Sequence, residues 1–403
     1  MNKRRIVIVA LSLVSMAWLP CKAAKAPKKP WTFFVYIAGD NNLAQFVTLD
    51  LGEMMKVGSN ANAHIIAYTT EKQVGKPKQT NRYEVLPGSL KKIGSTTVED
   101  SGSVATFKKA LEWAVVNYPS DRIAVVLWDH GSGTLNPGRS PQGWKGICWD
   151  DTTHHFLTDR DCCDVFKYVN NTYRNGKKID IVACDACLMA SLEVAHTFRT
   201  YVDYFVASEE NIPGYGYQYA RALAPLKNGN PKPVDFAKSM VKAYDDAYKT
   251  SGWDYTLSAL DLKQLDAVVT NLNKIAQFFI SQLKTPNKTN LKQALAALIA
   301  PAATIHYGTM DYIDLYQWLS NIQNNIVTMK LSTQDTKTLK DLITATLPLI
   351  TKAVLARCNS KNYAKSYGMT IYFPRTVMDS SYKNLLWTGA AQWTSFLQAY
   401  LKK

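Results

Sequence analysis

Hydrophobic residues in the first half of the chain form short, nearly continuous runs that alternate with stretches of helical periodicity. Runs of this kind are typical of strands buried on both faces of a parallel sheet. The expected strands are 31–38, 64–69, 122–128, 179–183 and 204–207. Between the second and third of them, apolar residues recur at helical spacing over 104–118, and Pro119 ends this helix. The alternation predicts a doubly wound α/β domain over residues 31–225.

After Pro225 the pattern of apolar residues becomes mostly helical. The expected helices are 234–248, 261–280, 291–298, 311–322 and 338–354. One strand-like island, 369–373, is closed by Pro374 and could return to the main sheet as an extra strand. We therefore expect an α/β core followed by a largely helical C-terminal region over residues 226–403.

Residues 1–24 have the three-part composition of a secretory signal peptide, with a basic start, an apolar stretch over 6–19 and small residues at the end. Cleavage there would leave a basic, proline-containing linker over 25–30. Cys21 raises the alternative of a lipid anchor, although Pro20 fits a lipidation signal badly. The expected location is secreted, periplasmic or at the cell surface.

Composition narrows the class of partner only slightly. The 403 residues are 47% hydrophobic and 20% charged, which indicates a globular protein and not a disordered chain. The net charge of +15 could suit nucleic acid. The basic residues are scattered, however, and no zinc-finger or RNA-binding signature accompanies them, so nucleic acid is not an expected partner. We expect a monomer.

Two of the expected strands end in residues that could perform nucleophilic catalysis. Strand 122–128 is followed by Asp-His130-Gly131, and strand 179–183 by Cys-Asp-Ala-Cys187. Ligands of open α/β sheets bind beyond the carboxyl ends of the strands. If the two strands are parallel neighbours, Cys187 and His130 share one edge. A cysteine thiolate is a nucleophile, its pKa falls beside an imidazolium or at a helix N-terminus, and histidine is a general acid and base. The N–H groups of Gly131 and Cys187 are candidates for an oxyanion hole.

A strand ending in D-H-G-S-G, followed further along by a strand ending in D-A-C-L-M, resembles the clostripain family of cysteine peptidases in the caspase-like clan. Further similar segments are YIAGDNN (36–42), GICWDD (146–151), ASEENIPGYG (207–216) and GMTIYFP (368–374). The resemblance implies a caspase-like α/β/α sandwich with a mostly parallel central sheet. It also implies an endopeptidase with a catalytic dyad of His130 and Cys187, cleavage after Arg or Lys, and a zymogen that cuts itself.

Asp185 matches the family's acidic residue that binds the basic P1 side chain, where P1 is the substrate residue before the scissile bond. A carboxylate in a partly closed pocket favours a cation over neutral or acidic side chains. Glu209 and Glu210 are weaker candidates for a second acidic residue.

The self-cleavage that the resemblance implies would fall in the loop 133–146, which is rich in Gly, Pro, Ser and Asn and therefore exposed. The loop contains two basic residues, Lys145 and Arg139, and we favour Lys145 as the processing site. The uncut loop would occupy the specificity pocket, and cleavage would release it.

Two other functions compete with the peptidase. Cys184 and Cys187 form a C-x-x-C pair, which suits a thiol–disulfide oxidoreductase or half of a zinc site. The adjacent Cys162 and Cys163 point in different directions, so they are poor partners for zinc, and Cys184 is most simply a buried structural residue. A non-catalytic surface binding module on a peptidase fold is the second alternative.

No cofactor or metal is predicted. The family that the chain resembles includes calcium-dependent members. Three aspartates in expected loops, Asp40, Asp150 and Asp151, are the carboxylates considered as calcium ligands. Clustered carboxylates suit calcium, but no spaced loop motif accompanies these three.

Overall fold

A large mixed sheet forms the centre of the molecule. The computed structural model describes residues 25–94, 97–134, 146–308 and 311–402. Within them, nine strands pair in the order β13-β10-β9-β8-β5-β1-β2-β3-β4. The five inner strands, β9 to β2 in that order, run parallel. They are β1 (Lys29–Gly39), β2 (Ala63–Glu71), β5 (Ser120–Trp128), β8 (Ile179–Asp185) and β9 (Val202–Ala207). All five strands expected from the apolar runs are therefore present.

The edges of the sheet are antiparallel. A hairpin of β3 (Gln79–Leu86) and β4 (Ser89–Lys92) follows β2, and β10 (Thr256–Asp261) and β13 (Val354–Asn359) extend the sheet beyond β9. The last two strands come from the region expected to be mostly helical. Neither was anticipated, because each is a short apolar run beside a helix and has no distinguishing period.

The island at 369–373 is a strand, as expected, but it does not return to the main sheet, which was the place considered for it. Its strand β14 (Thr370–Tyr372) pairs with β12 (Tyr312–Asp314) in a small separate sheet that also contains β11 (His306–Tyr307). The place beside β9 that an extra strand would take is occupied by β10, which pairs with β9 and with β13.

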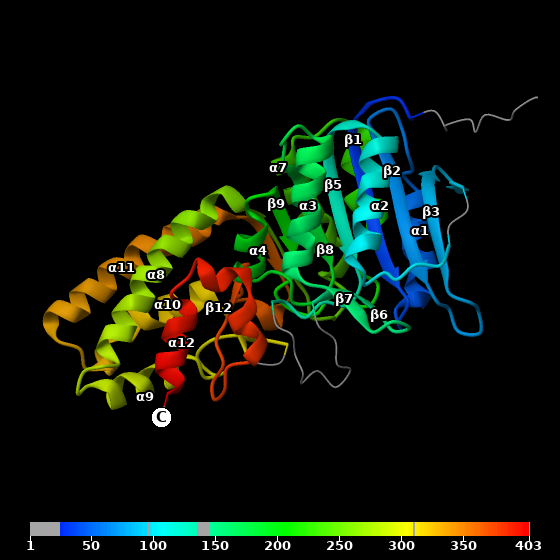
Figure 1. Ribbon diagram of the computed structural model, residues 1–403. Helices are drawn as coiled ribbons and strands as arrows, with labels where there is room; N and C mark the ends of the chain where they lie inside the picture. Colours follow the sequence, from blue (N-terminus) through cyan, green and yellow to red (C-terminus); the bar gives the residue numbers. More distant parts are fainter. Residues whose placement is uncertain (1–24, 95–96, 135–145, 309–310, 403) are drawn as a thin grey trace, which may run out of the picture.

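Helices cover both faces of the main sheet (Figure 1). Successive side chains of a strand point to opposite faces. In β1, Phe34 and Tyr36 belong to one buried cluster, and Phe33 and Val35 belong to the other. The first face is covered by α2 (Val104–Asn117) and α3 (Asp159–Tyr173), and the second by α1 (Ala44–Met55) and α7 (Pro233–Tyr248). The result is the expected caspase-like α/β/α sandwich.

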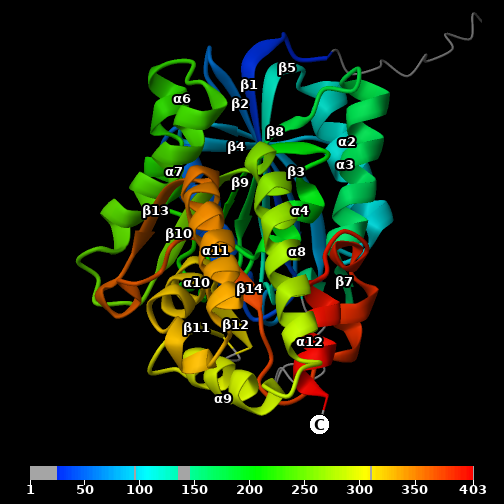
Figure 2. The same ribbon diagram turned by 90° about the vertical axis from the view of Figure 1, so that its left-hand side faces the viewer.

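The remaining long helices gather at one end of the molecule (Figures 1 and 2). They are α8 (Leu265–Gln282), α9 (Lys288–Leu298), α10 (Leu315–Asn324), α11 (Thr333–Ala353) and α12 (Trp393–Leu401). Helix α8 packs against α11 and α12. The helices expected after Pro225 are present, but α10 starts later than expected because the residues before it form β12.

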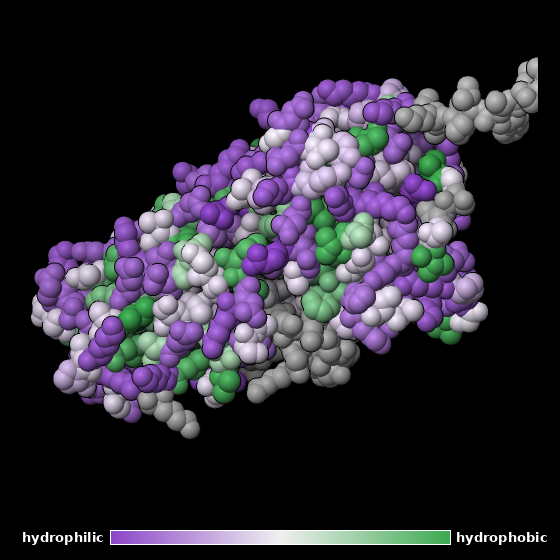
Figure 3. Space-filling view, viewed as in Figure 1, coloured by the Kyte–Doolittle hydropathy of each residue, from purple (hydrophilic) through white to green (hydrophobic). Residues whose placement is uncertain are grey.

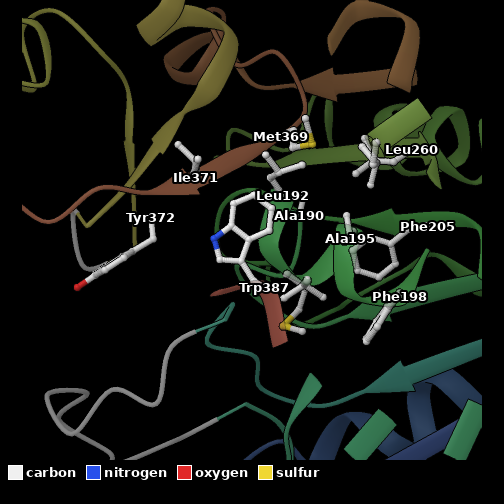
Figure 4. Packing of buried hydrophobic residues seen from close by; sticks show 14 of the residues in the cluster. Ala190, Leu192, Ala195, Phe198, Phe205, Leu260, Met369, Ile371, Tyr372 and Trp387 are labelled. Carbon is white, nitrogen blue, oxygen red and sulfur yellow. The ribbon is translucent and has the colours of Figure 1, made fainter. Parts of the chain in front are cut away.

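One hydrophobic cluster joins this helical region to the main sheet (Figure 4). Phe198 of α4 (Leu192–Phe198) and Phe205 of β9 contribute from the sheet side, and Met369, Ile371 and Trp387 contribute from the C-terminal region. These residues are at most 1% exposed. The C-terminal region therefore packs directly on α4 and β9, next to strand β8.

The surface seen in Figure 3 is largely hydrophilic, with hydrophobic residues scattered over it. None of the helices in the described ranges has the length and apolarity of a membrane-spanning segment. The expected signal peptide and Cys21 lie outside the described residues. The expected linker 25–30 is shorter than anticipated, because β1 begins at Lys29, whose N–H donates to the Pro119 carbonyl.

Candidate active site

The carboxyl ends of β5 and β8 bring the two predicted catalytic residues to one edge of the sheet. The two strands are parallel neighbours, and Trp128 pairs with Asp185. His130 and Cys187 each lie two residues beyond this pair. The backbone of Gly131 lies against the Cys187 carbonyl, because a Cβ atom on Gly131 would be 2.4 Å from that oxygen. Only glycine therefore allows the histidine and cysteine segments to approach so closely.

His130 is oriented by an asparagine that was not anticipated from the sequence. Its Nε2 lies 2.6 Å from Oδ1 of Asn42, in the turn between β1 and α1. An amide oxygen accepts, so Nε2 carries the proton and the lone pair of the neutral ring is on Nδ1. Burial lowers the pKa of His130 to about 4, so the ring is neutral at physiological pH. The sequence feature that could have identified Asn42 is its position just after β1, a third strand whose carboxyl end lies at the same edge.

Asn41 holds the turn that carries Asn42. Its Nδ2 donates to Oδ1 of Asp129 at 2.6 Å and to the Ala38 carbonyl at 3.1 Å. Its Oδ1 accepts from the N–H of Leu43 at 2.9 Å. Burial raises the pKa of Asp129 well above its usual range. These contacts tie the end of β1 to the end of β5, so the position of Asn42 relative to His130 is set by buried groups.

Cys187 lies on a sharp turn. Leu188 after it has φ 65°, in the left-handed region that non-glycine residues rarely adopt, and its N–H donates to the Glu210 carbonyl at 3.2 Å. The N–H of Ile212 donates to the Cys187 sulfur at 3.3 Å. Burial, with smaller contributions from neighbouring carboxyl groups, raises the pKa of the Cys187 thiol to about 11. The resting residue is therefore a thiol that needs a base.

Cys187 does not lie at a helix N-terminus, one of the two features that would lower the pKa of its thiol. Helix α4 begins at Leu192, and Ser191 caps it by accepting from the N–H of Val194. The segment between Cys187 and Ser191 is not helical. Because the dipole effect fades within the first turn of a helix, this helix does not lower the pKa of the thiol.

Asp185 lies beneath the catalytic edge. Its carboxylate accepts from the N–H of Tyr217 at 3.0 Å and from the hydroxyl of Tyr219 at 2.8 Å. Gly216 lies directly against it, since a Cβ atom there would be 2.7 Å from Oδ2. Burial raises the pKa of Asp185 to about 7. The loop that surrounds this carboxyl group also reaches the Cys187 sulfur, through the N–H of Ile212.

A second carboxyl group, Asp50 of α1, faces the same region and was missed in the sequence. It is 3% exposed and accepts from Nε1 of Trp128, the strand partner of Asp185, at 2.6 Å. Burial and the nearby charge of Asp185 raise the pKa of Asp50 to about 9. One acidic residue on a helix face carries no sequence signal, because its partners come from other elements.

Glu209 and Glu210, the weaker acidic candidates, are held by residues of the C-terminal region. The Glu209 carboxylate is buried and accepts from the Tyr307 hydroxyl at 3.2 Å and the Gly368 N–H at 3.1 Å. Glu210 accepts from the Tyr363 hydroxyl at 2.8 Å. Both carboxylates thus connect the end of β9 to the C-terminal region, a neighbour that the sequence could not place, and the substrate-binding role expected of Glu209 does not fit this geometry.

The other cysteines of the described ranges are unpaired. Cys184 is fully buried in β8, and burial raises the pKa of its thiol well above its usual range. A buried thiol of this kind is chemically inert, as expected for a structural residue. Within the described residues, no group of three or more His, Cys, Asp or Glu side chains is arranged to hold a metal ion.

The loop carboxylates considered for calcium have other partners. The Lys78 ammonium lies 2.8 Å from Asp40 and 2.5 Å from Asp150, so a lysine cation sits between the two carboxylates. Asp151 accepts from Nε1 of Trp149 at 2.6 Å.

Lys145 and Arg139, the two expected processing residues, lie outside the described residues. The ends of their loop are described and meet beside the histidine segment. The N–H of Ser132 donates to the Gly146 carbonyl at 3.1 Å, and the N–H of Gly146 donates to the Ser132 hydroxyl at 2.8 Å. The loop therefore leaves and re-enters the fold next to Gly131.

Solved structures of other proteins share the fold of this chain. The structure of an inactive zymogen C11 protease from Parabacteroides distasonis is 19% identical, with a TM-score of 0.67, and the match covers 91% of this chain and 99% of that one. A secreted C11 cysteine protease from Bacteroides thetaiotaomicron, solved with an irreversible peptide inhibitor, is 22% identical, with a TM-score of 0.64 and the same coverage. At these identities the two structures establish the fold.

Sequence comparison identifies the family. Clostripain from Hathewaya histolytica is 24% identical over 344 residues, which are 73% of this chain and 63% of that protein. The chain thus spans less than two thirds of the length of this curated relative. The model of the clostripain family matches residues 35–400, nearly the whole chain. The chain therefore belongs to the clostripain family of cysteine peptidases.

Proposed function

We propose that this protein is an exported cysteine endopeptidase that cleaves peptide bonds after Arg or Lys. The observation that carries the proposal is the juxtaposition, on adjacent strand ends, of a thiol, an oriented neutral imidazole and a buried carboxyl group. Asp185 in its ionised form would bind the P1 cation, and Arg or Lys reaches such a group with a charged head on an apolar stem.

The reaction follows from the protonation states. Nδ1 of His130 takes the thiol proton of Cys187, and the thiolate attacks the carbonyl carbon of the scissile bond. The N–H groups of Gly131 and Cys187 stabilise the oxyanion. His130 then gives its proton to the amine as the C–N bond breaks, leaving a thioester on Cys187. A water molecule, deprotonated by His130, hydrolyses the thioester and restores the thiol.

The resting pair is poorly prepared for this reaction. A thiol with a pKa near 11 gives up its proton reluctantly to an imidazole with a pKa near 4. A rearrangement that opens the site to water or brings a substrate dipole to it would reduce this difference. We infer, as the resemblance to the clostripain family implies, that the uncut chain is a zymogen and that cleavage after Lys145, or alternatively Arg139, activates it. The proximity of both loop ends to Gly131 supports self-cleavage.

We further propose that residues 1–24 export the protein, with a lipid anchor on Cys21 as the alternative, and that the mature enzyme acts as a monomer on peptides or proteins. The tripartite composition of the leader supports export. The fold relative from Bacteroides thetaiotaomicron, itself described as secreted, is consistent with that location.

The test compares purified wild type with Cys187→Ala and Cys184→Ala. We expect wild type and Cys184→Ala to split within residues 133–146 and to hydrolyse Lys- and Arg-amide substrates, while Cys187→Ala stays whole and inert. N-terminal sequencing of the fragments locates the cut. Loss of activity in both cysteine variants, together with disulfide reductase activity in wild type, would favour the oxidoreductase. Inert and uncut wild type would favour the binding module.

A further inference from the structure

Helix α1 and the loop 212–217 form two walls around Asp185. The turn before α1 reaches the edge that carries His130 through Asn42, and Asp50 lies further along the helix beside Trp128, the strand partner of Asp185. The loop begins at the Cys187 sulfur, where the N–H of Ile212 donates to it, and reaches the Asp185 carboxylate at Gly216. Both walls therefore lie beside the Asp185 carboxylate, the group proposed to bind the P1 cation.

Aromatic rings connect the outer parts of the two walls. Phe46, one turn after Asn42, contacts Tyr215 edge to face, with ring centroids 5.7 Å apart. Tyr215 also lies 6.1 Å from Trp253, in the loop before β10. Gly214 packs on Phe46, because a Cβ atom there would be 2.9 Å from the ring. Phe46 is half-buried, whereas Tyr215 is 53% and Trp253 49% exposed.

This exposure contrasts with the other aromatic residues of the region. Five tyrosines that pack against one another near Asp185 are at most 6% exposed, namely Tyr217, Tyr219, Tyr244, Tyr248 and Tyr255. The fold can thus bury aromatic rings beside Asp185, yet it leaves Tyr215, which precedes the Gly216 that packs on Asp185, and its neighbour Trp253 about half exposed. A gathering of exposed rings at a site, unlike single exposed residues, marks a binding surface.

We propose that Phe46, Tyr215 and Trp253 form an aromatic lip that binds the methylene stem of the P1 side chain, while Asp185 binds its charged head. The inference rests on the proposed cleavage after Arg or Lys, and it adds the residues that make binding depend on the length of the P1 side chain. The stems of Lys and Arg pack on apolar surfaces, and a cation near a ring face gains further attraction. A shorter cation cannot reach Asp185 and cover the rings at once. The lip therefore selects long basic side chains.

The test uses peptide amides that differ only in P1, which is Lys, ornithine or 2,4-diaminobutyrate. Wild type, Tyr215→Ala and Phe46→Ala are compared after each preparation has been titrated with an irreversible cysteine-directed inhibitor, so that only folded sites are counted. Removing a ring that covers part of the stem should raise KM for P1 Lys about five- to tenfold, with kcat within about twofold. The increase should shrink as P1 becomes shorter.

Two control variants sharpen the test. Tyr215→Phe keeps the ring and should behave as wild type, and Val327→Ala removes an exposed apolar side chain on a distant 3-10 turn. An unchanged KM in both lip variants, or an equal increase for all three P1 residues, would overturn the lip while leaving the peptidase intact. Wild type that cleaves neither Lys nor Arg substrates would instead overturn the proposed function itself.

Discussion

Substitution of Asn42 by Ala separates the orientation of His130, the proposed catalytic histidine, from substrate binding. The change removes the acceptor that lies 2.6 Å from Nε2 of His130. During proton transfer this bond joins a neutral amide to a ring that becomes charged, and such bonds contribute about 1.5–3 kcal/mol. Asn42 is exposed, so water replaces part of the interaction and the lower half of that range applies. One factor of ten in rate corresponds to ~1.4 kcal/mol, which predicts a decrease in kcat of about 10- to 40-fold.

The assay measures kcat and KM of wild type and Asn42→Ala on a P1-Lys amide across pH. KM and the melting temperature should stay unchanged, because Asn42 touches neither the P1 region nor the core. Asn42→Asp is the conservative variant, since it keeps an acceptor oxygen and adds a negative charge. It should restore much of kcat and move the acid limb to higher pH, because the charge raises the pKa of His130. A kcat of Asn42→Ala within twofold of wild type, or a loss confined to KM, would refute the reasoning.

Three further perturbations test other parts of the site. In wild type, KM for P1-Lys substrates should increase as pH falls through about 7, because protonation removes the Asp185 charge; Asp185→Asn should have a high KM without this pH dependence, and steady-state kinetics over pH 5–9 measure both. The Asp50 carboxyl group has a pKa near 9 when folded against an ordinary value of 3.8 when unfolded, so it stays protonated in the folded state while the unfolded chain ionises. The stability that this group contributes is greatest at low pH and is lost as pH rises between these two pKa values. Urea unfolding should therefore show the free energy of unfolding of Asp50→Asn rising relative to that of wild type as pH increases. A difference that stays constant with pH would contradict the assignment. Gly131→Ala places a methyl group 2.4 Å from the Cys187 carbonyl, so calorimetry should show a loss of about 1–3 kcal/mol of stability together with lost activity, and an active variant of wild-type stability would argue against the close approach.

The catalytic edge was accessible from the sequence because it depends on short-range patterns. Continuous apolar runs identified β5 and β8, and the residues after each run are necessarily at the strand ends. Once parallel pairing of adjacent strands is assumed, His130 and Cys187 must share an edge, and the structure confirms that pairing. The resemblance to the clostripain family rested chiefly on the same two segments. Local patterns thus determined the fold class and the position of the proposed dyad.

The groups that surround the dyad were decided by tertiary structure. Asn42 and Asp50 reach the site through the placement of α1, and a polar residue beside a strand end looks the same whether it faces the site or solvent. Glu209 shows the converse, since its carboxylate turns away to Tyr307 and Gly368, which lie far along the chain.

Strands β10 and β13 joined the sheet for the same reason. Their pairing depends on an edge that exists only after β9 is in place, and short apolar runs carry no period that identifies their partner. Residue type and spacing therefore determined which chemistry this chain can perform. Long-range packing decided which polar groups surround His130 and Cys187. Those contacts join residues that are far apart in the sequence, so no local pattern predicts them.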